Sequence, residues 1–220
     1  MASTPVVTGR SIPAWPKDAL RVSFGIVWLI DAVLKWLPGF RTGYVAMTNM
    51  AAQGQPGWLH PWFSFWMKLQ DPRAAFFVYL AAVIETLIAV ALITGFARKF
   101  TYISAAVFSL LVWSIAEGFG GPYGSGSTDI GTSIIYALFF AGLLVLAYYA
   151  GTDRYSADYY LEKKVSWWWR VAELRRPVAS QLVTATLVPA QTAAVTPDGV
   201  PQPRTAEPVK TPEPAGPSSS

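Results

Sequence analysis

The sequence predicts an all-α integral membrane protein: a four-helix bundle with an interfacial outer link and a cytoplasmic amphipathic surface helix. Two observations support this fold class. Of the 220 residues, 53% are hydrophobic and only 14% are charged, whereas soluble domains carry about 25% charged residues. In addition, four apolar stretches of about 17–22 residues each match the ~20 residues that a helix needs to cross the hydrocarbon core of a bilayer.

The chain divides into four regions: a polar N-terminal segment at 1–19, a four-span membrane domain at 20–150, an interfacial helix region at 151–176 and a tail at 177–220. The N-terminal segment lacks a short apolar core followed by small residues, so we expect no removable signal peptide. Proline, alanine, threonine and serine dominate the tail, and this composition is typical of disorder.

The four spans are predicted at residues 20–37, 74–95, 100–116 and 130–150. Pro38 and Gly39 end the first span, and a short basic turn at 95–99 joins the second to the third. Each span is long enough to cross a bilayer, although the hydropathy of the first is poor because Arg21, Asp31 and Lys35 interrupt it, and Glu85 interrupts the second.

The connecting segments differ in character. Link 38–73 is rich in Trp, Phe and Pro, which favours an interfacial or re-entrant segment over a free loop. Loop 117–129 contains five glycines and no basic residue. Residues 156–174 carry Lys163, Lys164 and a tryptophan triplet, so we expect one amphipathic helix lying on the lipid headgroups.

Lysine and arginine predict the topology. The N-terminal segment, the Arg98-Lys99 turn and the C-terminal region are basic, whereas loop 117–129 has no basic residue. Link 38–73 holds three basic residues, which weakens this bias without reversing it. Both termini are therefore expected on the cytoplasmic side.

Three ionisable residues lie inside the apolar spans: Asp31 and Lys35 in the first, and Glu85 in the second. A spacing of four places Asp31 and Lys35 on one helix face, in a stripe with Arg21 and Trp28. Counted from the cytoplasmic ends, Asp31 lies ~16 Å deep, Lys35 ~22 Å and Glu85 ~15 Å. A charge at this depth costs at least ~2.5–3.5 kcal/mol, so we expect the three to meet inside the bundle.

Two interpretations of this cluster remain open. In the first interpretation, Asp31 and Lys35 neutralise each other. Glu85 is then either protonated or paired to Lys35, and it holds the helices together. In the second, the cluster is a proton or ligand site, because two carboxylates beside one ammonium in a low dielectric have displaced pKa values.

The outer loop offers a second group of polar residues. Ser127, Thr128 and Asp129 are placed to cap the fourth span, and Tyr136 continues along the face of Asp129. Free N–H groups at a helix start favour anions, although the Asp129 carboxylate competes for them as the cap. Glu117 is expected to be a solvated residue at the end of the third span.

Composition also excludes several chemistries. The chain has no cysteine and a single histidine, His60, so disulfides, Fe–S clusters, bis-histidine haem and His-rich metal sites within it are excluded. We expect His60 at the interface. The net charge of +4 comes from residues flanking the spans, so a nucleic-acid partner is not expected and membrane lipid is.

Two stretches resemble the DoxX/DoxD family, which includes the small membrane subunit of thiosulfate:quinone oxidoreductase. They are RVSFGIVWLIDAVLKWLPGF at 21–40 and GGPYGSGSTDIGTSIIYALFFAGLLV at 120–145, within a resemblance that covers about residues 20–150. The matching positions are Arg21, Asp31, Lys35, Gly121, Pro122, Thr128, Asp129 and Gly131. The resemblance implies a four-helix membrane subunit that pairs with a second protein and passes electrons from thiosulfate to a diffusible quinone, giving tetrathionate.

Candidate site residues follow from the charge pattern and the resemblance together. We assign Asp31, Lys35 and Glu85 as catalytic, Arg21, Trp28 and Tyr136 as quinone contacts, and Arg41, Gly121, Thr128 and Asp129 as contacts for the sulfur oxyanion; no metal is expected. Two other functions are considered. One is a non-catalytic scaffold for a redox-stress complex, since some family members are associated with superoxide dismutase and a sulfurtransferase. The other is a small proton-coupled transporter, which the lack of a convincing internal repeat disfavours.

Overall fold

The computed structural model describes residues 15–123, 129–150, 152 and 154–175, and all regular secondary structure in these residues is helical. The predicted all-α class is therefore confirmed. The four long helices are α1 (Trp15–Lys35), α4 (Ala74–Thr94), α5 (Arg98–Ile115) and α6 (Thr132–Ala150). They coincide with the four predicted spans, except that α1 begins at Trp15 rather than at residue 20.

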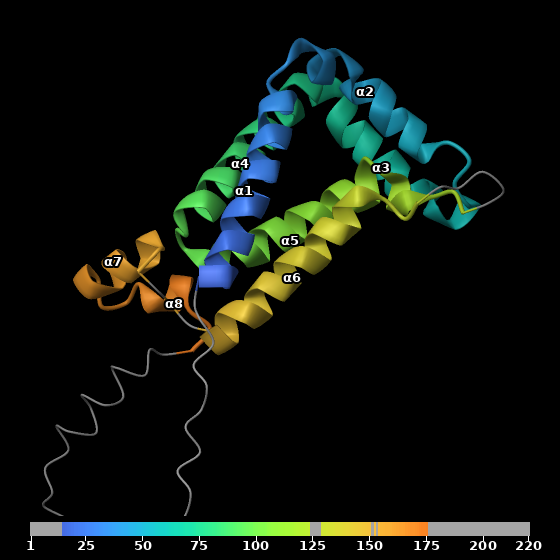
Figure 1. The fold of residues 1–220 in the computed structure, drawn as a ribbon. Coiled ribbons are helices and arrows are strands. Elements are labelled where there is room, and N and C mark those ends of the chain that lie inside the picture. Colours follow the sequence, from blue (N-terminus) through green and yellow to red (C-terminus); the bar gives the residue numbers. More distant parts are fainter. Residues whose placement is uncertain (1–14, 124–128, 151, 153, 176–220) are drawn as a thin grey trace, which may run out of the picture. The chain divides into compact units, whose positions relative to one another are not determined.

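The long helices pack as two pairs, with α1 along α4 and α5 along α6 (Figure 1). Close approach within the first pair depends on Gly25, where an added Cβ would lie 3.0 Å from Leu92 Cβ and 3.1 Å from the Ile93 backbone nitrogen. Aromatic side chains join α1 to α6: the ring of Phe24 lies 3.9 Å from that of Phe139 and 5.5 Å from that of Tyr136, centroid to centroid. Small and large apolar side chains together fill the core.

Link 38–73 is helical rather than a free loop. It contains α2 (Pro38–Ala52), the 3-10 helix η1 (Gly57–Leu59), α3 (His60–Gln70) and the 3-10 helix η2 (Asp71–Arg73). Proline stands in the first turn of both α2 and α3, where its missing N–H costs nothing. Side-chain bonds connect the link to α5 and to η3 (Gly118–Gly120): Trp62 Nε1 donates to Ser114 O at 3.2 Å and Gln55 Nε2 to Gly118 O at 3.0 Å.

Beyond α6 the chain forms α7 (Ala157–Lys164) and α8 (Trp169–Ala172), which correct the single helix expected over 156–174. The buried carboxylate of Asp158 explains the break. It accepts from Ala97 N at 2.7 Å, from Arg98 N at 2.9 Å and from Trp168 Nε1 at 2.9 Å. A straight helix would carry Trp168 about 15 Å along the axis from Asp158, so the chain turns back after α7, where Val165 is extended.

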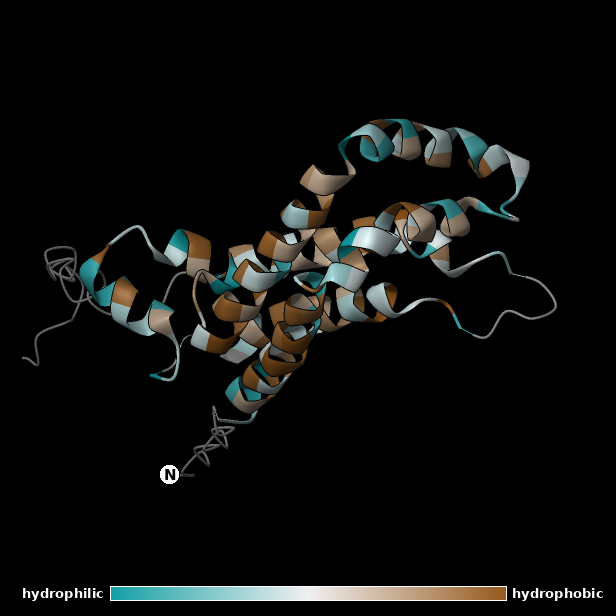
Figure 2. Ribbon diagram, turned by 90° about the horizontal axis from the view of Figure 1, so that it is seen from above, coloured by the Kyte–Doolittle hydropathy of each residue, from teal (hydrophilic) through white to brown (hydrophobic). Residues whose placement is uncertain are grey.

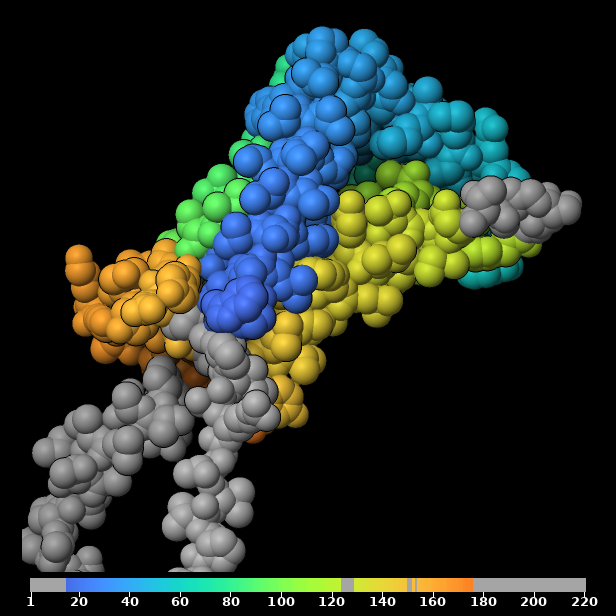
Figure 3. Space-filling view, viewed as in Figure 1, coloured from blue at the N-terminus to red at the C-terminus, as the bar shows by residue number. Residues whose placement is uncertain are grey.

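Arg21 connects α1 to the end of α4 and to the segment before α7. Its guanidinium donates to the carbonyls of Leu92 and Ile93 at the end of α4, the second at 3.0 Å, and to Tyr155 O at 3.1 Å. Carbonyls in the last turn of a helix lack intrahelical donors, so Arg21 satisfies α4 and holds the segment before α7. Figure 3 shows α7 and α8, in orange, against the start of α1, in blue.

Hydrophobic residues run along the long helices, whereas hydrophilic residues are more frequent on the shorter helices at either end (Figure 2). Many apolar side chains of the long helices are exposed, among them Ile30 (59%), Leu87 (63%) and Leu138 (64%). Within the described residues, two helical stretches are long and apolar enough to cross a membrane: Gly57–Thr94, which includes α3 and α4, and Thr132–Tyr149 in α6.

Candidate functional site

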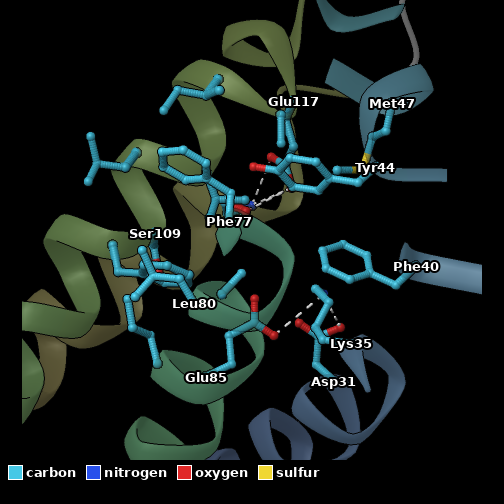
Figure 4. A pocket seen from close by; sticks show the side chains of 18 of the residues that line it. Asp31, Lys35, Phe40, Tyr44, Met47, Phe77, Leu80, Glu85, Ser109 and Glu117 are labelled. Carbon is cyan, nitrogen blue, oxygen red and sulfur yellow. Dashed lines mark hydrogen bonds and ion pairs between the residues drawn. The ribbon is translucent and has the colours of Figure 1, made fainter. Parts of the chain in front are cut away.

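The three ionisable residues predicted inside the spans meet in the structure. Lys35 Nζ lies 3.1 Å from Asp31 Oδ1, on the same helix, and 3.5 Å from Glu85 Oε2 of α4 (Figure 4). The Glu85 side chain is 5% exposed, compared with 20% for Lys35 and 36% for Asp31. The cluster is therefore an ion-paired group of two carboxylates and one ammonium, with Glu85 as its deepest member.

A cavity of about 610 Å³ adjoins this cluster. Its walls are mostly aromatic and aliphatic side chains from α1 to α6, and all three charged residues line it. The lining includes Trp28, Asp31, Lys35, Phe40, Tyr44, Met47, Trp66, Gln70, Phe77, Glu85, Phe108, Ser109, Glu117, Ser133 and Tyr136. This volume falls within the range of about 300–1,000 Å³ that is typical of ligand pockets.

The helices of link 38–73 supply one wall of the cavity. Phe40, Tyr44 and Met47 project from α2, and Trp66 and Gln70 from α3. Tyr44 Oη donates to Gln70 Oε1 at 3.0 Å and joins the two helices. Burial, with the negative charge of Asp71 as the second cause, raises the pKa of Tyr44 to about 12, so its hydroxyl remains a donor. The aromatic content of the link predicts an interfacial or re-entrant segment but does not indicate that its side chains would line a cavity.

Glu117 stands at the opposite end of the cavity from Glu85 (Figure 4). Its carboxylate accepts from Ser133 N, at 3.0 Å to Oε2, and from Ser133 Oγ, at 2.8 Å to Oε1. Glu117 therefore caps the start of α6 from the end of α5, which corrects the expectation of a solvated residue. Asp129 Oδ1 accepts from Gly131 N at 2.7 Å. Since carboxylates already hold these N–H groups, the start of α6 does not offer them to an external anion.

The residues assigned to a quinone separate into two groups. Trp28 and Tyr136 line the cavity, with ring centroids 5.1 Å apart. Arg21 lies outside the cavity lining, and its buried guanidinium is 3.3 Å from Asp18 and bonded to the end of α4. Arg21 therefore acts in packing between helices, where the sequence predicts a ligand contact.

The residues assigned to a sulfur oxyanion do not converge. Arg41 donates to the Tyr79 hydroxyl at 3.0 Å on an exposed surface, Asp129 is exposed, and Gly121 N donates to Gly118 O at 3.0 Å. None of these three lines the cavity. Thr128 and Ser127 lie outside the described residues.

His60 and the acidic residues that the structure describes do not form a metal centre. The imidazole Nε2 of His60 lies 3.3 Å from Gln55 O. In the part of the chain that the structure describes, no group of three or more histidine, aspartate or glutamate side chains is arranged to hold a metal ion.

Fold and site together define an all-helical protein with a buried ion-paired cluster on the wall of an aromatic cavity. No family model, no curated protein and no solved structure matches this chain.

Proposed function

We propose that this chain is a membrane subunit of an oxidoreductase complex, similar to DoxX/DoxD proteins, that binds a quinone in its cavity. Electrons would come from thiosulfate oxidised with a partner subunit. The observation that carries the proposal is the Asp31–Lys35–Glu85 cluster on the wall of a cavity that is otherwise aromatic and aliphatic. Charged groups inside apolar helices are costly and are usually functional.

The exposed apolar surface supports a membrane location. Large hydrophobic side chains stand exposed along α1, α4, α5 and α6, a pattern that is unfavourable in water and favourable in lipid. On this proposal all four helices cross the bilayer. Both termini then face the cytoplasm, and α7 and α8 lie near the lipid headgroups, with Trp167 56% exposed.

The lining of the cavity suits a quinone. Trp28, Phe77, Phe108 and Tyr136 offer aromatic faces to a planar ring, and such faces prefer stacked or edge-on ring contacts. The charged cluster stands at one end of the same cavity. A quinone ring requires this combination of apolar walls and few polar groups.

The cluster supplies the proton chemistry on this proposal. A bound quinone accepts two electrons and two protons to give a quinol, while two thiosulfate ions lose two electrons to give one tetrathionate. Lys35 Nζ and the carboxyl groups of Asp31 and Glu85 are the ionisable groups placed to hold those protons. Around the cavity, three carboxylates (Asp31, Glu85, Glu117) face one ammonium, so we place thiosulfate oxidation outside the cavity, with the partner.

Thiosulfate-driven quinone reduction by the complex, purified in mild detergent, tests this function. Mass spectrometry of the sample should detect a bound quinone and a partner protein. Asp31→Asn and Lys35→Met should each lower the rate about 100-fold, the typical range for losing a group that transfers protons. Lys68→Met, at an exposed lysine outside the cavity lining, is the matched control and should leave the rate unchanged. Wild-type rates in both cluster variants would refute the proposal.

A non-catalytic scaffold is the second candidate, and one observation favours it. The α7–α8 unit is held by buried bonds and still exposes Tyr160 (58%) and Trp167 (56%). Exposed aromatic residues on a rigid element suit protein contacts. Loss of co-purifying proteins from Tyr160→Ser and Trp167→Ser, with no quinone reduction in the wild-type complex, would favour the scaffold.

A further inference from the structure

The tryptophan indoles differ in whether their N–H group has a hydrogen-bond acceptor. Among the indoles that donate are Trp36, to Thr86 Oγ1 at 3.1 Å, Trp62, to Ser114 O at 3.2 Å, Trp113, to Ile130 O at 2.7 Å, and Trp168, to Asp158 Oδ1 at 2.9 Å. Within the described residues, the Nε1 atoms of Trp28 and Trp66 are buried and have no hydrogen-bond partner. A buried donor without a partner costs about 1–3 kcal/mol.

The hydroxyl of Ser109 shows the same contrast. Several other hydroxyls in the helices donate to a carbonyl in the preceding turn, for example Thr48 to Val45 O at 3.0 Å, Thr86 to Ala82 O at 2.7 Å and Ser114 to Leu111 O at 3.1 Å. Such local bonds are the usual way for a helical hydroxyl to satisfy itself. Ser109 Oγ is buried and makes no such bond within the described part of the chain.

Three of the buried side-chain donors that lack a partner among the described residues line the cavity, whereas a further one, Arg21 Nε, belongs to a guanidinium bonded outside it. Trp28 on α1, Trp66 on α3 and Ser109 on α5 line it, and Trp28 and Ser109 are only 3% and 1% exposed. Ser109 is labelled among the lining residues in Figure 4. Buried polar groups of native proteins nearly always have partners. Three exceptions around one cavity therefore indicate that its occupant supplies the acceptors.

We infer that the cavity binds an uncharged, planar ring that bears carbonyl oxygens, and that Trp28 Nε1 and Ser109 Oγ donate to those oxygens. This inference rests on the proposed function and identifies the groups that hold the ring. Indole N–H is a donor only, so it selects acceptor atoms on the ligand. The excess of carboxylates over ammonium groups around the cavity disfavours an anion, and aromatic walls favour a flat ring.

The test compares two ligands on the full-length protein in lipid nanodiscs. One is menadione, a naphthoquinone with a methyl group, and the other is methylnaphthalene, which has the same ring system and no carbonyl oxygen. Equilibrium dialysis against empty nanodiscs corrects for partition into lipid. The readout is the ratio of the two affinities, because a variant that unfolds loses both ligands whereas a variant that lacks one donor loses only the preference for menadione.

Wild-type protein should bind menadione at least tenfold more tightly than methylnaphthalene. Trp28→Phe and Ser109→Ala should each lower the ratio about fivefold, as expected for one neutral hydrogen bond. Ser109→Thr retains the hydroxyl and should restore the ratio. Trp58→Phe, at an indole that is 77% exposed and outside the cavity lining, should match the wild type.

A ratio near one in the wild type would overturn the inference, because water would then be sufficient to satisfy the donors. An unchanged ratio in both Trp28→Phe and Ser109→Ala would also overturn it. The two proposals fail separately. If the protein prefers menadione to methylnaphthalene but the complex does not reduce quinone with thiosulfate, the ring-binding site stands and the proposed activity is refuted. If the complex reduces quinone but the affinity ratio is unchanged in Trp28→Phe and Ser109→Ala, the proposed activity stands and the assignment of these two donors is refuted.

Discussion

Glu117 connects the end of α5 to the start of α6 through a few strong hydrogen bonds. Its carboxylate accepts from both the backbone nitrogen and the hydroxyl of Ser133. Removing the capping side chain of a helix costs about 0.5–2 kcal/mol, so Glu117→Ala should lower the free energy of unfolding by about 1–2 kcal/mol. In a chain of this length that change lowers the apparent melting temperature by about 2–8 °C, which a thermal scan in detergent would measure.

Two further variants complete the Glu117 experiment. Glu117→Gln keeps one acceptor oxygen and should lose about half as much stability as Glu117→Ala. Asp129→Asn is the matched control, because Asp129 is exposed and its bond to Gly131 N is local. A larger loss in Asp129→Asn than in Glu117→Ala would show that the cap comes from Asp129, as the sequence alone predicts.

The residues of the site differ in how far the sequence could predict them. Asp31, Lys35 and Glu85 were predictable, because a charge in an apolar span is conspicuous and helix rise places Asp31 and Glu85 at nearly equal depth, with Lys35 one turn further out. Glu117 and Ser109 were not, because nothing local distinguishes a capping glutamate from a solvated one or a self-bonded serine from an unsatisfied one. Their roles depend on which helices become neighbours.

The α7–α8 element carries a carboxyl group that responds to pH. Burial, with the negative charge of Glu173 as the second cause, raises the pKa of Glu162 from 4.5 to about 7, against the hydrogen bond from Thr152. Between these two values the folded element holds a proton that the unfolded chain has released. Its stability therefore falls as the pH rises through this interval and levels off above about pH 7.

Hydrogen exchange of the α7–α8 amides, corrected for intrinsic rates, would measure this slope. Protection should be greatest below about pH 4.5 and should decrease towards about pH 7. Glu162→Gln should remove the dependence, whereas Lys164→Gln, at an exposed residue of the same helix, should retain it. Protection that increases with pH in the wild type would contradict the assignment of this proton to Glu162.

The elements themselves were predictable where composition changes sharply. The second span begins at Ala74 as predicted, two residues after Pro72, and ends where Gly95 adopts a left-handed φ of 67°. The first helix extends back to Trp15, since its polar first turn with Pro16 and Asp18 suits a helix start although it is not apolar. The break between α7 and α8 was hidden, because the bond that requires it joins Trp168 to a buried Asp158.

Membrane topology can be measured cleanly because the chain has no cysteine. Trp58, in the link before α3, is 77% exposed, and Tyr160, in α7, is 58% exposed. On our proposal α4, α5 and α6 all cross the bilayer between these two positions, and an odd number of crossings places them on opposite sides. A membrane-impermeant maleimide should therefore label Trp58→Cys in intact cells, and Tyr160→Cys only after permeabilisation.

The number of crossings decides the outcome of this experiment. Two stretches meet the length and composition of a membrane span, Gly57–Thr94 and Thr132–Tyr149. If only these crossed, positions 58 and 160 would lie on the same side and both variants would react together. If only Tyr160→Cys were labelled in intact cells, the result would agree with four spans but would show that their orientation in the membrane is the reverse of the one proposed. The unsubstituted chain, which has no thiol, supplies the background, and labelling after solubilisation shows that each cysteine is reactive. If α4 and α6 cross, positions 58 and 160 can lie on opposite sides of the membrane only when α5 crosses as well. Arg98 and Lys99 stand in the first turn of α5, and this position keeps their positive charge next to the cytoplasmic headgroups.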